Sequence, residues 1–328
     1  MNAHESKEII LRTKDLKTHF TVVNPKDGQK QKLYAVDGVT LSIAPGEILG
    51  IVGESGCGKS TLGRTVLRLE ERTSGDVYFR EENVFEATPE RVNELRKHVQ
   101  MIFQDPYSSL NPRKRVSSLL EQPLRLHSIG DLSDRIQRVE ALMAEVGLDP
   151  KFRTRFPHQF SGGQRQRIGI ARALAVDPEL IVCDEAVSAL DVSVQAQILN
   201  LLADLQDRRN LTYLFISHDL SVVEFIATRV VVMYLGRIVE EATTKDLMAK
   251  PLHPYTQALF EAYPVIDPRK RGVTKRIVSG DVPSPIDPPK GCHFAPRCPF
   301  ATDRCREAYP PTFEPEVGRN VACWLFGK

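Results

Sequence analysis

The chain has 328 residues, of which 41% are hydrophobic and 26% charged, values that fit a soluble globular protein. Its 44 basic and 42 acidic residues leave a formal net charge of +2, without the basic excess of most nucleic-acid binders. No apolar run approaches the roughly 20 residues of a membrane-spanning helix, and none follows the polar start Met1 to Glu8 as a secretory signal requires. We therefore expect a cytoplasmic protein that meets a membrane only through a partner and does not bind nucleic acid.

The first part of the chain predicts two strands, a glycine-rich loop and a helix. Residues 39–43 alternate apolar and polar side chains, and residues 48–52 form an apolar run, so both are expected to be strands. Residues 60–69 carry apolar side chains at helical spacing. A loop between a buried strand and a helix is the setting in which phosphate-binding loops occur.

The middle of the chain predicts helices and then alternating strands and helices. Residues 110–176 have a helical pattern, with an apolar stripe formed by Ile136, Val139, Met143 and Val146. From Leu180 we expect a strand to Glu185, a helix that carries Val194, Ile198, Leu201 and Leu205, and a strand over residues 213–218. This order is typical of a parallel α/β fold.

The composition changes near residue 250. Of the 22 prolines, 13 lie between Pro251 and Pro315, and regular periodicity fades there. We therefore predict a main domain over residues 1–250, which contains a helical subdomain at about residues 105–172, and a C-terminal extension over residues 251–328.

The loop matches the phosphate-binding pattern G-x-x-x-x-G-K-[ST]. Its glycines allow backbone N–H groups to surround phosphate oxygens, Lys59 is expected to bridge the β- and γ-phosphates, and the Ser60 hydroxyl to bind Mg²⁺. The residues expected to contact ATP here are Gly53, Ser55, Gly56, Cys57, Gly58, Lys59, Ser60 and Thr61.

Two carboxylates end the predicted strand at residues 180–185. Ligands of open α/β sheets gather at the carboxyl ends of strands, where Asp184 suits Mg²⁺ and Glu185 suits activation of the water that attacks the γ-phosphate. Without the upstream loop, such carboxylates would equally suit the cap of a following helix.

A second glycine-rich string lies upstream of these carboxylates. Residues 160–167 read Phe-Ser-Gly-Gly-Gln-Arg-Gln-Arg, and residues 171–174 read Ala-Arg-Ala-Leu. This string resembles the signature motif of ABC transporter ATP-binding subunits. The resemblance implies an α/β ATPase core with a mainly parallel sheet, an antiparallel β subdomain and a helical subdomain. In this family two subunits pack head to tail, so the signature residues contact ATP held by the partner; here these are Ser161, Gly162, Gly163 and Gln164. Taken alone, Ser-Gly-Gly also suits a helix cap.

The resemblance assigns four further positions. Gln104 would bind Mg²⁺ or water and sense the γ-phosphate, and His218 would contact that phosphate as a switch. Asp191 would couple the two sites of the dimer, although it also suits the N-cap of the next helix. Phe20 would stack on adenine, with His19 as the alternative ring.

The tail resembles that of ATPases from dipeptide and oligopeptide importers, with the strings His-Pro-Tyr-Thr-Gln-Ala-Leu at 253–259 and Pro-Ser-Pro at 283–285. This branch implies uptake of di- or oligopeptides, a second homologous ATPase as heterodimer partner, two transmembrane permease subunits and an extracytoplasmic solute-binding protein. The chain would then lie at the cytoplasmic face of the inner membrane. The alternatives are an importer ATPase for nickel or glutathione, and a soluble ABC-type ATPase without a membrane partner.

Four cysteines follow in the tail, at spacings of C-x5-C-x6-C-x17-C: Cys292, Cys298, Cys305 and Cys323. Four thiolates can hold zinc or an iron–sulfur cluster, either of which would stabilise a segment with little core. The spacing lacks the short C-x2-C pairs of common zinc ribbons, and the importer branch implies a 4Fe-4S cluster. The cluster is therefore the predicted cofactor beside ATP and Mg²⁺, with zinc, and then unligated or disulfide-paired cysteines, as the alternatives.

Overall fold

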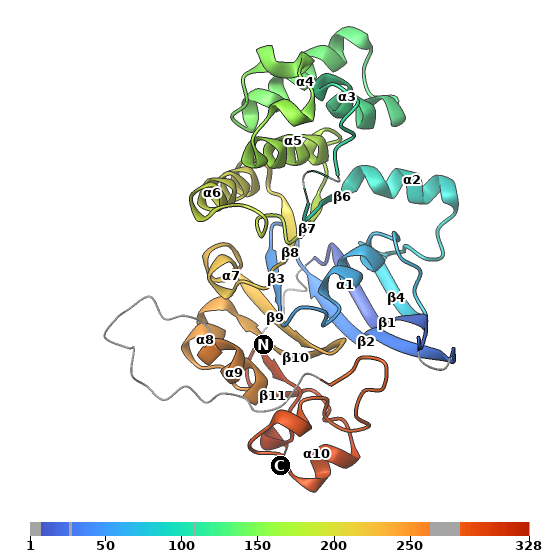
Figure 1. Ribbon diagram of the computed structural model, residues 1–328, viewed down its shortest axis with the longest axis vertical. Helices are drawn as coiled ribbons and strands as arrows, with labels where there is room; N and C mark the ends of the chain where they lie inside the picture. Colours follow the sequence, from blue (N-terminus) through green and yellow to red (C-terminus); the bar gives the residue numbers. More distant parts are fainter. Residues whose placement is uncertain (1–7, 26–27, 106, 108, 263–282, 328) are drawn as a thin grey trace, which may run out of the picture. The chain divides into compact units, whose positions relative to one another are not determined.

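The computed structural model describes residues 8–25, 28–105, 107, 109–262 and 283–327 (Figure 1). Met1–Lys7 and residues 263–282 of the predicted extension therefore lie outside the described residues. The chain divides into two compact units that alternate along the sequence. The first unit comprises Met1–Ile10, Ile43–Ile48 and Arg80–Ile216, and the second comprises Leu11–Ser42, Leu49–Phe79 and Ser217–Lys328.

Three parallel strands form the sheet of the first unit. They are β6 (Val99–Ile102), β7 (Leu180–Asp184) and β8 (Thr212–Ile216), with Met101 opposite Val182 and Val182 opposite Leu214. Every residue of β7 and β8 is buried, as expected for parallel strands covered on both faces. The strand predicted over residues 180–185 is confirmed, and Glu185 is the first residue beyond it.

The remaining elements of the first unit are mainly helices, and α3, α4 and α5 pack against one another (Figure 1). Their bounds are β5 (Glu82–Asn83), α2 (Pro89–His98), α3 (Val116–Leu126), α4 (Leu132–Glu145), the 3₁₀ helices η1 (Pro150–Thr154) and η2 (Pro157–Gln159), α5 (Gly162–Leu174) and α6 (Val192–Arg209). Asp131 and Asp134 cap the start of α4 by accepting each other's backbone N–H groups.

The apolar stripe predicted for α4 is buried only over its C-terminal part. Val139, Met143 and Val146 are buried, whereas Ile136 is 40% exposed. Leu132, at the start of the helix, is also exposed, so the first turns of α4 leave their apolar side chains open to solvent. The stripe predicted from Ile136 to Val146 is therefore part of the core only from Val139 onward.

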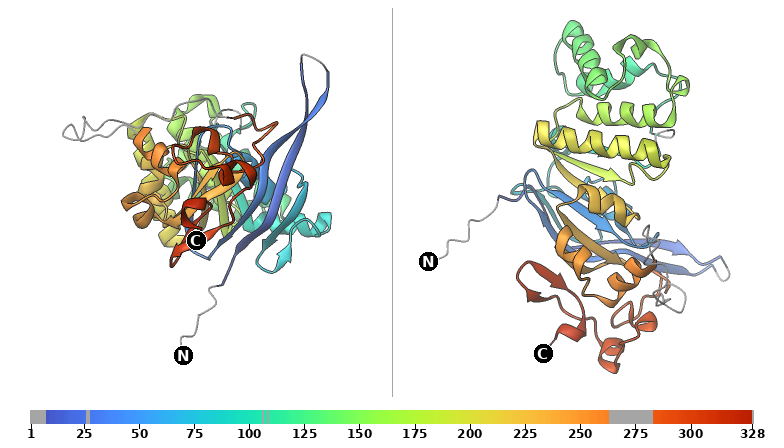
Figure 2. Two further views of the ribbon diagram at one scale, coloured as in Figure 1. Left: turned by 90° about the horizontal axis from the view of Figure 1, so that it is seen from below. Right: turned by 90° about the vertical axis from the view of Figure 1, so that its left-hand side faces the viewer.

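The second unit contains an antiparallel sheet and a mixed sheet. In the first, β1 (Leu11–Val23) lies between β2 (Lys30–Ile43) and β4 (Ser74–Phe79) and pairs with β4 antiparallel; Figure 2 shows the long β1 and β2 in blue. In the second, β3 (Ile48–Val52) pairs parallel with β9 (Arg229–Tyr234). The antiparallel β subdomain and the strand at residues 48–52 are confirmed.

Three strands nearer the C-terminus continue the mixed sheet. Strand β10 (Arg237–Thr243) pairs antiparallel with β9 and with β12 (Arg319–Val321), which pairs with β11 (Phe313–Glu316); the last two are drawn in red in Figure 2. The other elements of the unit are α1 (Lys59–Val66), α7 (Leu220–Ile226), α8 (Thr244–Ala249), α9 (Pro254–Ala262), η4 (Ala295–Arg297), α10 (Asp303–Glu307) and η5 (Trp324–Phe326). The boundary predicted near residue 250 stays a prediction.

In the part of the chain that the structure describes, no helix combines the length and the apolar character needed to cross a membrane.

Candidate active site

The loop after β3 presents backbone N–H groups at the start of α1. Gly58 is the N-cap of α1 and offers no side-chain acceptor to the first N–H groups of the helix. Its φ of 101° favours glycine, and a Cβ there would lie 1.9 Å from the carbonyl oxygen of Ala35. Because no side chain caps them, the N–H groups at this helix start are suited to phosphate oxygens.

Carbonyl oxygens of the phosphate-binding loop hold the side chain of Lys59. Its side chain is buried, and Nζ donates to the carbonyl oxygens of Gly53 at 2.8 Å and Glu54 at 3.0 Å. Nζ also lies 3.7 Å from Sγ of Cys57, a thiol whose pKa is raised by burial although the lysine opposes that rise. These contacts fix the position of the Lys59 ammonium group within the loop.

Gln104 and Glu185 meet at the carboxyl ends of the paired strands β6 and β7. Nε2 of Gln104 donates to Oε2 of Glu185 at 2.8 Å. The backbone of Glu185 has a φ of 46°, and its N–H donates to the carbonyl oxygen of Ile216 at 3.0 Å. Asp184, the last residue of β7, is 1% exposed. The structure thus joins two residues that the sequence assigned separately.

The signature residues form the start of α5. The Ser161 hydroxyl accepts the Gln164 N–H at 3.3 Å, and Oε1 of Gln164 accepts the Ser161 N–H at 3.0 Å, which is a complete capping box. Gly163 is required by a close approach, because a Cβ there would lie 2.4 Å from Cγ1 of Val194. Ser161 and Gln164 nevertheless remain exposed, so the cap and a phosphate contact are compatible.

Asp191 caps α6, as the helix-cap alternative predicted. Its Oδ1 accepts the Val194 N–H at 3.0 Å and the Ser193 hydroxyl at 2.7 Å, and these bonds lower the pKa of the carboxyl. The side chain is exposed, so the cap leaves it accessible to a second subunit.

In the second unit, the two candidate rings for adenine stacking differ in their contacts. The His19 side chain is only 6% exposed; Nε2 lies 3.0 Å from Oδ1 of Asp37, and the ring packs against Tyr34 at 4.6 Å between centroids. Phe20 is partly exposed on β1. His218 follows β8 and is exposed.

The four tail cysteines surround one small cavity but do not form the predicted metal site. The cavity measures about 20 Å³, room for about one water molecule. Burial raises the pKa of Cys292 to about 11 and that of Cys323 to about 12. Among the described residues, no group of three or more Cys, His, Asp and Glu side chains could hold a metal ion. The predicted 4Fe-4S cluster, and the zinc alternative, are therefore wrong; all six cysteines are free thiols.

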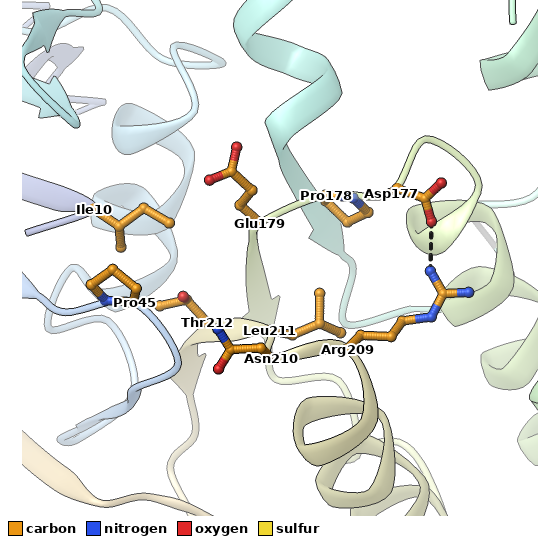
Figure 3. Close-up of a pocket in the computed structure, with 9 residues that line it drawn as sticks. All are labelled: Ile10, Pro45, Asp177, Pro178, Glu179, Arg209, Asn210, Leu211 and Thr212. Carbon is orange, nitrogen blue, oxygen red and sulfur yellow. Dashed lines mark hydrogen bonds and ion pairs between the residues drawn. The ribbon is translucent and has the colours of Figure 1, made fainter.

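A larger cavity of about 380 Å³ lies at the opposite ends of β7 and β8 from Glu185 (Figure 3). Its charged groups already pair within the first unit. Arg209 points toward Asp177, with 2.6 Å between Nη1 and Oδ1, and Glu179 pairs with His98 at 2.8 Å. Each charged side chain that lines this cavity therefore already forms an ion pair within the protein.

Sequence reasoning missed the residues that support the loop from the C-terminal segment. Arg297 and Tyr255 both contact Glu54, over sequence separations of 243 and 201 residues. Tyr255 lies in the tail string at residues 253–259 and Arg297 precedes Cys298, but neither position signals a contact with the loop.

Residues 36–188 match the ABC transporter family, and residues 239–305 match the oligopeptide/dipeptide transporter C-terminal region. The oligopeptide transport ATP-binding protein AppF of Bacillus subtilis is 50% identical and covers 98% of both chains. The dipeptide transport ATP-binding protein DppF of Haemophilus influenzae is 49% identical over 96% of both chains.

Solved structures agree in fold. A dimeric, post-hydrolysis structure of the ATP-binding cassette MJ0796 bound to ADP and Pi is 28% identical, with a TM-score of 0.64 over 71% of this chain and 98% of that one. The protein cbiO1 of Clostridium perfringens, part of the ABC transporter complex cbiONQ, is 25% identical, with a TM-score of 0.62 over 74% of this chain and 92% of that one. This chain therefore belongs to the ATP-binding subunits of ABC transporters, in the oligopeptide and dipeptide transport branch.

Proposed function

We propose that this chain is the ATP-hydrolysing subunit of an ABC importer that takes up di- or oligopeptides. The hydrogen bond between Gln104 and Glu185 carries the proposal, because it orients a carboxylate at the end of β7 as hydrolysis requires, whereas binding alone needs only the loop. The names of the relatives as oligopeptide and dipeptide transport ATP-binding proteins support the solute class.

ATP is bound through its phosphates and its base. Lys59 gives up its hydrogen bonds to the loop carbonyl oxygens and pairs with the β- and γ-phosphates instead. The N–H groups at the start of α1 bind the remaining phosphate oxygens. Ser60, Asp184 and Gln104 hold Mg²⁺, which neutralises phosphate charge when bound. Phe20 stacks on adenine; the near-complete burial of the His19 side chain supports this choice.

Glu185 polarises the water that attacks the γ-phosphate. Gln104 fixes the orientation of the carboxylate by donating to Oε2. His218 contacts the γ-phosphate.

A second, homologous ATPase subunit completes each site. Ser161, Gly162 and Gly163 bind the ATP held by the partner, and Asp191 couples the two sites. The exposure of Ser161 and Asp191, although both cap helices, supports this assignment. ATP closes the dimer and hydrolysis reopens it.

The dimer acts at the cytoplasmic face of the inner membrane on two transmembrane permease subunits, which receive the peptide from an extracytoplasmic binding protein. The match of residues 239–305 to the oligopeptide/dipeptide transporter region supports this assembly.

Co-purification from solubilised membranes and reconstitution into proteoliposomes test the proposal. We expect the chain to retain permease subunits, and its ATP hydrolysis to rise when the binding protein carries a di- or oligopeptide. Repeated absence of permease subunits would favour a soluble ABC-type ATPase. Stimulation by nickel or glutathione instead of peptide would assign the chain to another solute.

A further inference from the structure

The C-terminal segment holds Glu54, the first variable residue of the phosphate-binding loop, at its side chain and its backbone. The N–H of Glu54 donates to the Tyr255 hydroxyl oxygen at 2.9 Å. The carboxylate accepts from Arg297, and the carbonyl oxygen accepts from Lys59 Nζ at 3.0 Å. The residue thus lies between the extension and the lysine that binds phosphate, and all these contacts fall within the second unit.

Two nitrogens of the Arg297 guanidinium contact the Glu54 carboxylate. Nη1 lies 3.2 Å and 3.1 Å from Oε1 and Oε2, and Nη2 lies 3.3 Å from Oε1. The arginine side chain is 11% exposed and the glutamate 29%, so water screens this pair less than a surface pair. Two-pronged arginine–carboxylate contacts fix orientation as well as distance.

A packed aromatic cluster supports the guanidinium. Nη1 of Arg297 also donates to the Tyr234 hydroxyl at 3.3 Å. The rings of Tyr234, Tyr255 and Phe294 are all buried, with centroids 4.5 to 5.5 Å apart. Tyr234 lies on β9, Tyr255 on α9 and Phe294 just before η4, so the arginine packs beside buried rings from three parts of the chain.

We infer that Arg297 is a positioning residue for nucleotide binding, through which the C-terminal extension sets the affinity of the phosphate-binding loop for ATP. The inference rests on the proposed function, because it concerns the same loop. Arg297 neutralises a carboxylate that lies one residue from Gly53 and would otherwise repel the phosphates.

This role predicts a specific pattern in four variants. Arg297→Ala leaves the Glu54 carboxylate unpaired, so ATP binding weakens roughly tenfold, while kcat at saturating ATP changes much less. Glu54→Gln removes the charge that Arg297 neutralises and binds ATP with near-normal affinity. The double variant Arg297→Ala, Glu54→Gln then binds like Glu54→Gln alone, because no unpaired carboxylate remains. Arg306→Ala is the matched control, since Arg306 lies in the same extension and pairs with the exposed Asp303.

Titration of each full-length variant with MgATP, followed by steady-state ATPase assays, tests the inference. The inference is supported if adding Glu54→Gln to Arg297→Ala restores the ATP affinity and if Arg306→Ala binds ATP as the wild type does. Unchanged ATP affinity in Arg297→Ala overturns it. A tenfold loss that Glu54→Gln does not rescue also overturns it, because Arg297 would then merely hold the fold together.

A second variant covers the case in which Arg297→Ala fails to fold. Tyr255→Phe removes only the hydroxyl that accepts the Glu54 N–H, and it should weaken ATP binding severalfold in a protein of native circular dichroism. Wild-type affinity in this variant contradicts the inference. The proposed function is judged separately: wild-type protein that binds ATP without hydrolysing it refutes that function, whereas the binding comparison still decides the role of Arg297.

Discussion

Gln104 and Glu185 are joined by a hydrogen bond of 2.8 Å although 81 residues separate them in the chain. The bond forms because β6 and β7 pair in parallel, with Ile102 opposite Cys183, so that the residues beyond both strands emerge at one edge. It connects the residue assigned to γ-phosphate sensing with the residue assigned to water activation.

Replacing Glu185 with Gln should abolish turnover and preserve ATP binding. The amide cannot take up a proton from the attacking water, so we expect kcat to fall about 100-fold or more. Single-turnover hydrolysis and ATP titration measure the two effects. The control is Glu179→Gln, the same change just before β7, where Glu179 pairs with His98; its turnover should stay near wild type. Normal hydrolysis by Glu185→Gln would refute the assigned role.

Replacing Gln104 separates orientation from charge. Gln104→Ala removes the hydrogen bond to Glu185 and should lower kcat by roughly tenfold without changing the shape of the pH–rate profile. Gln104→Glu places a second carboxyl beside Glu185, and two such neighbours cannot both stay ionised at low pH. The acidic limb of its profile should therefore move to higher pH. An unchanged kcat in Gln104→Ala would show that the bond does not orient the base.

Ser161 has two roles that two substitutions can distinguish. Ser161→Ala loses the cap of α5 and should destabilise the protein by about 1 kcal/mol, besides losing ATPase activity. Ser161→Asp keeps a good capping group but brings a negative charge toward the partner's ATP. We expect near-normal thermal stability and strongly reduced ATPase activity. An active Ser161→Asp variant would mean that Ser161 is a helix cap only.

Asp37 should make the stability of the second unit depend on pH. Burial alone would raise the pKa of its carboxyl, but Arg237, at 2.6 Å, and His19, at 3.0 Å, lower it below its ordinary value. A carboxylate with a lowered pKa stabilises the fold above its ordinary pKa, and the contribution disappears as pH falls through the folded-state pKa. Asp37→Asn should therefore cost about 2 kcal/mol near neutral pH and progressively less in acid. Denaturant unfolding at several pH values checks this; a cost independent of pH would exclude the charge as its source.

Cys57 should be unreactive although it lies in the phosphate-binding loop. The side chain is 3% exposed, and burial raises the pKa of its thiol, so little nucleophilic thiolate forms near neutral pH. Brief treatment with N-ethylmaleimide should leave ATP binding unchanged, and inactivation should accelerate as the pH rises. A loss of ATP binding that also occurs in treated Cys57→Ser would be due to another thiol. Rapid inactivation near neutral pH that Cys57→Ser prevents would contradict the predicted protection.

The local elements of this protein follow from the sequence alone. The strand at residues 48–52, the glycine-rich loop after it and the helix that begins at Lys59 depend on neighbouring residues, whose periodicity and backbone freedom can be read from a short window. The caps at Ser161 and Asp191 are equally local. For the same reason, the family resemblance rests on short contiguous strings.

Only the tertiary structure decides contacts between distant segments. The bond from Gln104 to Glu185 depends on strand pairing. Arg297 contacts Glu54 across 243 residues of sequence, and a hydrophobic periodicity does not predict contacts over such a separation. The cysteine spacing at residues 292–323 predicted a metal centre, yet spacing does not determine whether thiols converge around an ion or line a cavity of about 20 Å³. Motifs specify which chemical groups are present, because they are local; packing determines which groups meet.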